Sequence, residues 1–67
     1  MMTIEVRVPA GDVSTPMRNM RQWLDDMRFD PSSFNRTEIV GRAAVWVKFK
    51  ATEEAIAFAE QFAGRVL

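Results

Sequence analysis

Hydroxyl and carboxyl groups are the side chains of this 67-residue sequence that could take part in catalysis. The sequence contains no His, Cys or Tyr, so no imidazole is present to activate a hydroxyl as a nucleophile. Carboxylates act as general acids or bases only where burial or a nearby charge shifts their pKa. Glu5 and Glu38 each lie two residues from an arginine, Arg7 or Arg36, which is typical of a solvated ion-pair surface. We therefore expect a protein without catalytic activity.

Metal and cofactor sites are not expected either. The absence of Cys and His removes the usual ligands of zinc. Asp25 and Asp26 are adjacent, and neighbouring helical residues diverge by about 100°, so these carboxylates do not converge on one cation. Gly11 follows an apolar segment but lacks the Lys-Ser/Thr pair that completes a phosphate-binding loop. The sequence thus predicts neither a metal nor a cofactor.

The segment 43–50 is the best defined structural element in the sequence. Its residues alternate strictly between two faces, Ala43, Val45, Val47 and Phe49 on one and Ala44, Trp46, Lys48 and Lys50 on the other. Alternation in a run rich in β-branched and aromatic residues predicts a β-strand. The first set forms a core face, whereas the second places one large aromatic side chain among cations on a solvated face.

Two further strands and a short tail are predicted. Residues 2–8 alternate in the same way and end at a proline, which cannot donate to a sheet ladder. Residues 34–40 have the length of a strand but alternate less clearly. Residues 65–67 form a stub that is too short for a full strand.

Two amphipathic helices are predicted between these strands. Residues 16–28 repeat apolar side chains at spacings of three and four, and Thr15 with the proline after it is typical of a helix start. Residues 53–63 show a broad apolar face, with Thr52 as the expected N-cap. Gly64 is expected to terminate this second helix.

The pairing of the last two strands depends on the loop between them. A two-residue loop at residues 41–42 would set Glu38 opposite Val45 and place a carboxylate on the core face. A three-residue loop at residues 41–43 would pair Ile39 with Val45 instead. Because a one-residue slip turns every side chain to the other face, we predict this second register. It places Asn35, Thr37 and Ile39 inside, Glu38 beside Trp46 outside, and Arg36 beside Lys48 outside.

The predicted order, βαββα followed by a stub, resembles the ferredoxin-like plait, an α+β fold in which two helices cover one face of an antiparallel sheet. The resemblance is to a truncated plait, as in some small bacterial proteins, because the last strand is nearly absent. That strand normally covers the outer edge of the first, and natural proteins rarely leave such an edge open. We therefore expect a homodimer, formed by edge pairing, by acceptance of the partner's tail or by exchange of an element. The candidate dimer edge consists of Thr3, Ile4, Glu5, Val6, Val66 and Leu67.

Residues 42–49 also resemble the central-strand motif of RNA recognition motif domains, which share the plait. The matching positions are the basic start, one aromatic, the aliphatic and the closing aromatic, namely Arg42, Trp46, Val47 and Phe49. By this resemblance Trp46 would stack a base and Arg42 would contact a phosphate. The sequence departs from the pattern at Ala43, Ala44 and Val45, where the family has a glycine, the first stacking aromatic and a small residue.

The candidate ligand or interface face comprises Trp46, Arg42, Lys48, Arg36, Glu38 and Arg7. Nine basic residues balance nine acidic ones, whereas nucleic-acid-binding proteins usually have a basic excess. Self-association is therefore the preferred function at this stage, with single-stranded RNA binding and cofactor-free catalysis of the dimeric plait type as alternatives. The sequence opens without a basic and apolar leader and has no apolar run of membrane-spanning length, so we expect a soluble, cytoplasmic protein without a membrane partner.

Overall fold

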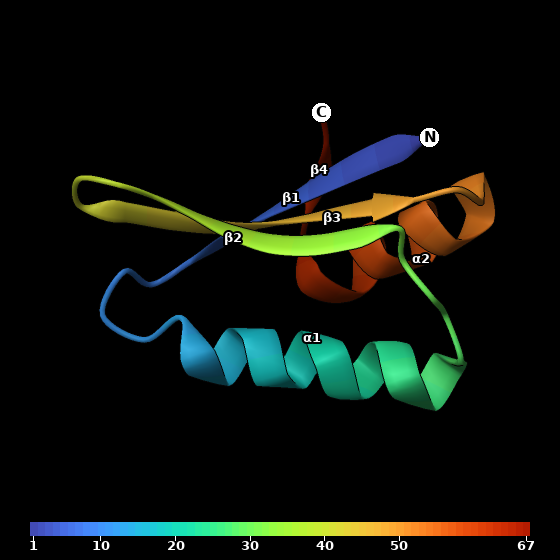
Figure 1. Ribbon diagram of the computed structural model, residues 1–67, viewed down its shortest axis with the longest axis horizontal. Helices are drawn as coiled ribbons and strands as arrows, with labels where there is room; N and C mark the ends of the chain where they lie inside the picture. Colours follow the sequence, from blue (N-terminus) through green and yellow to red (C-terminus); the bar gives the residue numbers. More distant parts are fainter.

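The computed structural model describes the backbone of residues 1–67 and every side chain except that of Ile39. The elements follow the order β1 (Met2–Val8), α1 (Ser14–Met27), β2 (Ser33–Ile39), β3 (Arg42–Phe49), α2 (Thr52–Phe62) and β4 (Arg65–Val66). They form one antiparallel sheet with the strand order β2-β3-β1-β4. Both helices lie on the same side of this sheet (Figure 1). The predicted α+β fold with βαββα order is confirmed, and the stub adds a two-residue strand at the position of the last plait strand.

The core lies between the sheet and the two helices. The predicted core face of β3 is confirmed, because Ala43, Val45, Val47 and Phe49 are all buried. The helices contribute buried Met20 and Leu24 from α1 and buried Ala55 and Phe58 from α2. Aromatic rings close the core at one end, with the Trp23 ring 5.7 Å from Phe62 and 5.6 Å from Phe29. Packing of large apolar side chains therefore supplies the stability that a chain without disulfides needs.

The hairpin between β2 and β3 differs from both registers considered above. Its loop consists of Val40 and Gly41, so that Ile39 pairs with Arg42 and Phe34 pairs with Val47. Gly41 has a φ of 75°, in the left-handed region that glycine adopts without strain. The predicted pairing of Ile39 with the middle of β3 is thus wrong.

The burial of Phe34 explains the observed register. Phe34 packs against the core opposite the buried Val47, and the guanidinium of Arg21 lies 5.5 Å from its ring centroid. In the predicted register this large aromatic side chain would point away from the helices. Consequently Arg36 and Glu38, which alternate with Phe34, lie on the helix side of the sheet. The predictions that Glu38 lies beside Trp46 and Arg36 beside Lys48 on the outer face are wrong.

Both helix starts lack the predicted side-chain caps. The first helix begins at Ser14, and the carboxylate of Asp12 accepts a hydrogen bond from the Thr15 amide at 3.3 Å. Thr15 is therefore inside the helix and is not its cap. The second helix begins at Thr52 itself, after an extended Ala51 that makes no side-chain cap hydrogen bond.

Gly64 is not the left-handed residue that ends α2, although the sequence predicts this role for it. The left-handed residue that ends the helix is Ala63, with a φ of 53°. Gly64 follows it and lies directly against β1, where an added Cβ would come within 2.6 Å of the Cγ2 atom of Ile4. The glycine is therefore required for space at this position.

The tail after Gly64 covers part of β1. Val66 pairs with Ile4, and the amide of Leu67 donates a hydrogen bond of 2.9 Å to the carbonyl of Thr3. The first strand is thus an inner strand over this stretch, which differs from the open edge that we expect from the sequence. The two edge strands of the sheet are β2 and β4. Because β4 is only two residues long, β2 is the longer of them.

Candidate ligand-binding face

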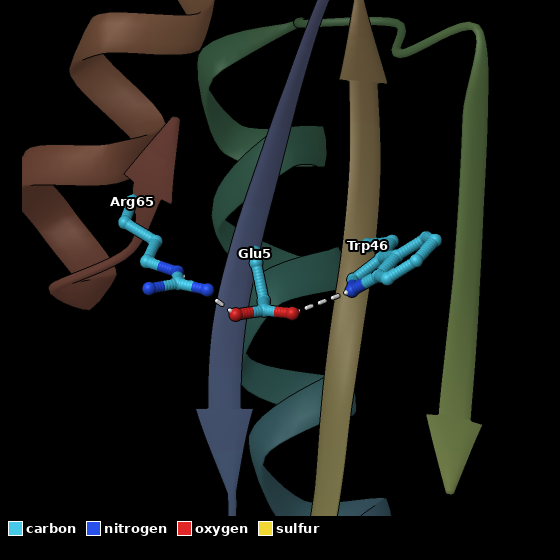
Figure 2. Close-up of polar contacts among 3 residues, drawn as sticks. All are labelled: Glu5, Trp46 and Arg65. Atoms are coloured by element: carbon cyan, nitrogen blue, oxygen red, sulfur yellow. Dashed lines mark hydrogen bonds and ion pairs between the residues drawn. The ribbon is translucent and has the colours of Figure 1, made fainter. Parts of the chain in front are cut away.

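The side of the sheet turned away from the helices is here called the open face. Alternation along the strands places every second residue of β1 and β3 on it, together with Arg65 of β4. Figure 2 shows Glu5, Trp46 and Arg65 on this face, with the helices behind the sheet. The Trp46 side chain is the large aromatic among them, and Trp46 remains 41% exposed.

Glu5 links three strands across the open face. It is the direct cross-strand neighbour of Trp46 in β3 and of Arg65 in β4. The indole Nε1–H of Trp46 donates a hydrogen bond of 2.9 Å to one carboxylate oxygen. The Nε–H of Arg65 donates one of 3.0 Å to the other oxygen (Figure 2). The indole is therefore held in one orientation across the sheet.

These contacts stabilise the ionised form of Glu5. The hydrogen bond from Trp46 lowers the pKa of Glu5 most, and the positive charges of Arg65 and Arg7 lower it further against the opposing effect of desolvation. The Glu5 side chain is 15% exposed, so the pair with Arg65 is partly shielded from water. A carboxyl group held in its ionised form is a poor general acid at neutral pH.

A shallow depression of about 580 Å³ lies next to this group of residues. Arg7, Arg42 and Arg65 contribute to its lining together with Trp46. The small side chain of Ala44 also lines it. The depression therefore combines an aromatic wall with three guanidinium groups, which suits a planar ligand that carries negative charge.

Formal charge is unevenly distributed between the two sides of the protein. The charged residues of the open face are Glu5, Arg7, Arg42, Lys48 and Arg65. Four cations and one carboxylate give this face a net side-chain charge of +3. Because the whole chain has a formal charge of zero, the rest of the molecule carries a net charge of −3.

Four of the six residues predicted for the ligand face are brought together on it. Trp46, Arg42, Lys48 and Arg7 share the open face. The remaining two, Arg36 and Glu38, lie on the other side of β2 and form an exposed ion pair with a nitrogen–oxygen distance of 3.7 Å.

Sequence reasoning did not assign Arg65 to this face, because a two-residue strand has no recognisable pattern. It placed Glu5 on the outer face of the first strand and also in the candidate dimer edge. Glu5 lies on the open face, opposite Trp46. The remaining predicted edge residues lie at the junction of β1 with the tail: Thr3, Ile4, Val6, Val66 and Leu67.

Metal-binding groups and membrane-spanning helices are also absent among the described residues. Among them, no group of three acidic side chains is close enough to hold a metal ion. Neither helix is long and apolar enough to cross a membrane. Comparison with protein families, with curated proteins and with solved structures finds no match for this chain.

Proposed function

We propose that this protein is a non-catalytic binding domain and that its open face binds single-stranded nucleic acid, with RNA as the ligand. The observation that carries the proposal is the charge of +3 gathered around the exposed Trp46. A net charge of zero for the whole chain argues against such binding only where the charges are evenly spread. A polyanion would meet the open face first, because opposite charge steers association.

Each part of the face has a function in this proposal. The indole of Trp46 supplies a stacking surface, held in place by Glu5. Arg7 and Arg42, which line the depression beside it, are placed to bind phosphates. Arg65 is already paired with Glu5 and contributes to the positive field more than to direct contact.

Fluorescence anisotropy of a labelled single-stranded oligouridylate tests this function. Trp46→Ala is expected to weaken binding at least about fivefold, since one stacked base contributes about 1–3 kcal/mol. Arg42→Ala is expected to weaken binding and to reduce the slope of log K against log salt by about 0.7. Arg18→Ala is the matched control, because it removes an exposed arginine from α1, on the helix side of the sheet and away from the open face.

The result that contradicts the proposal is equally specific. Absence of binding by the wild-type protein at about 50 mM salt would refute it. So would equal losses for Arg42→Ala and Arg18→Ala, because binding would then not depend on the open face.

We also propose that the protein self-associates. Support comes from the edge strand β2 and from the tail, where Val66 and Leu67 are 54% and 53% exposed. Exposed apolar side chains at a sheet edge favour pairing with a second copy. Light scattering across a dilution series from about 100 to about 1 μM measures the mass directly, and a monomer throughout would contradict this proposal.

A further inference from the structure

We infer that two copies pair through β2 in antiparallel orientation, around a two-fold axis at Thr37, and so form one continuous eight-stranded sheet. This inference rests on the proposed self-association and identifies the surface that would carry it. The partner is a second copy of this chain.

The edge formed by β2 is the most suitable one in the sheet for strand pairing. β2 has seven residues, whereas β4 at the opposite edge has two. Seven extended residues span about 23 Å, and their outward backbone groups have no partner strand in the described part of the chain. Natural proteins protect such edges with proline, bulges or charged side chains. The sequence of β2 contains no proline, and its two charges, Arg36 and Glu38, are of opposite sign and therefore do not repel a second copy in a register that pairs them.

The register follows from the side chains on the helix side of β2. We consider a symmetric dimer in which all four helices lie on one side of the combined sheet. In such a dimer, each β2 residue on the helix side pairs with a β2 residue of the second copy that is also on the helix side. Of these registers, only the one centred on Thr37 sets Arg36 opposite Glu38 of the second copy, and it does so twice. Registers centred on Arg36 or on Glu38 would set like charges opposite each other, which destabilises a strand pair.

The ion pair between Arg36 and Glu38 within one copy does not prevent them from pairing with a second copy. Arg36 and Glu38 are 3.7 Å apart within one copy, and their side chains are 57% and 55% exposed. Such an exposed pair contributes little to folding. Directly opposite side chains in an antiparallel strand pair have Cβ atoms about 5 Å apart, so Arg36 of one copy and Glu38 of the other can form an ion pair.

This arrangement is compatible with ligand binding on the open face. A dimer that stacked the two open faces on each other would bring two surfaces of charge +3 into contact. Edge pairing places them side by side on one surface instead, so each keeps its own Trp46 accessible. The dimer would then present two binding faces to one strand of nucleic acid.

Charge reversal with rescue tests the register. Sedimentation equilibrium over about 1–100 μM is expected to show a wild-type dimer that dissociates in the micromolar range, because a single strand pairing buries less than the about 800 Å² per partner of a stable interface. Arg36→Glu alone and Glu38→Arg alone are each expected to raise the dissociation constant about tenfold. The double variant Arg36→Glu/Glu38→Arg is expected to dimerise like the wild type, because both ion pairs between the two copies are restored with the charges exchanged. An equimolar mixture of the two single variants is expected to form a heterodimer.

A crosslinking measurement provides an independent readout. The sequence has no cysteine, and Thr37→Cys would place two thiols directly opposite each other across the axis. Oxidation is expected to give a covalent dimer, while Asn35→Cys on the same side of the strand is expected to give markedly less.

The outcomes separate the two proposals. A wild-type monomer at all concentrations would overturn both the self-association and this interface. A wild-type dimer that the charge reversals leave unchanged would overturn only the β2 interface. Loss of dimer in the single variants without recovery in the double variant or the mixture would also overturn the register. Nucleic-acid binding is measured separately with the Trp46 variant.

Discussion

Gly64 provides a direct test of how the tail is attached to the sheet. A Cβ added at this position would lie 2.6 Å from Cγ2 of Ile4, 3.0 Å from Cγ2 of Val6 and 3.2 Å from the carbonyl oxygen of Glu5. Ile4 is fully buried and Val6 is 5% exposed, so neither side chain can move aside without disturbing the core. Forcing a methyl group into a packed site costs about 1–3 kcal/mol. We expect Gly64→Ala to lower the free energy of unfolding by about 2 kcal/mol.

Urea denaturation followed by circular dichroism measures this loss. The value is large for a domain of this size, whose total stability is of the order of 3–10 kcal/mol. Gly11→Ala is the matched control, because an added Cβ there would meet no atom within 4 Å. Its stability is expected to be unchanged or raised by up to about 1 kcal/mol through the unfolded state. Equal stabilities of the two variants would refute the proposed packing of the tail against β1.

Two other variants test the polar link and the helix end. The contribution of Glu5 to stability is present above its ordinary pKa of 4.5 and is lost as the pH falls through its lower folded pKa, because the unfolded state then binds more protons than the folded state. Glu5→Gln is therefore expected to lose less stability than the wild type between about pH 5 and pH 2 in denaturant titrations, and an identical pH dependence would contradict the role of Trp46 and Arg65. Ala63→Gly is expected to raise the free energy of unfolding by about 0.5–1 kcal/mol, because glycine adopts the left-handed φ of 53° without steric cost. A lower stability of Ala63→Gly in the same urea assay would show that the strain is not relieved.

The strands that alternate clearly are those that sequence reasoning predicts well. In β1 and β3, one set of alternate residues is uniformly apolar, whereas the other set is mostly polar, with Ala44 and Trp46 as the exceptions. Hydrophobic burial therefore determines which side faces the helices. The location of Trp46 on the open face follows directly from this pattern. The relation of β1 to β3 also follows, because both core faces must meet the same helices.

The hairpin shows where such reasoning fails. In β2, Phe34 and Ile39 are five positions apart, so a regular strand can place only one of them on the core side. The sequence alone does not show which register is adopted. The observed register partly buries Phe34 against the core and places Arg36 and Glu38 on the helix side, where both remain exposed. Gly41 at the second loop position was the available indication, since glycine readily adopts the positive φ that a type II turn requires there.

The candidate site was predicted only in part for the same reason. Arg7, Arg42, Lys48 and Trp46 belong to the clearly alternating strands, and they lie on one face as expected. Arg65 depends on a two-residue strand whose position is fixed by tertiary contacts of Gly64 with β1. Non-local packing of this kind leaves no periodic pattern in the sequence.

The separation of charge between the two sides gives the protein a large electric dipole moment. A particle with no net charge hardly migrates in electrophoresis near neutral pH, yet its positive side can still adsorb to a cation-exchange resin. Retention on such a resin therefore reports on the arrangement of the charges and not on their sum. Such a dipole would also orient the molecule before contact, so that the proposed polyanionic ligand would meet the open face with Trp46 first.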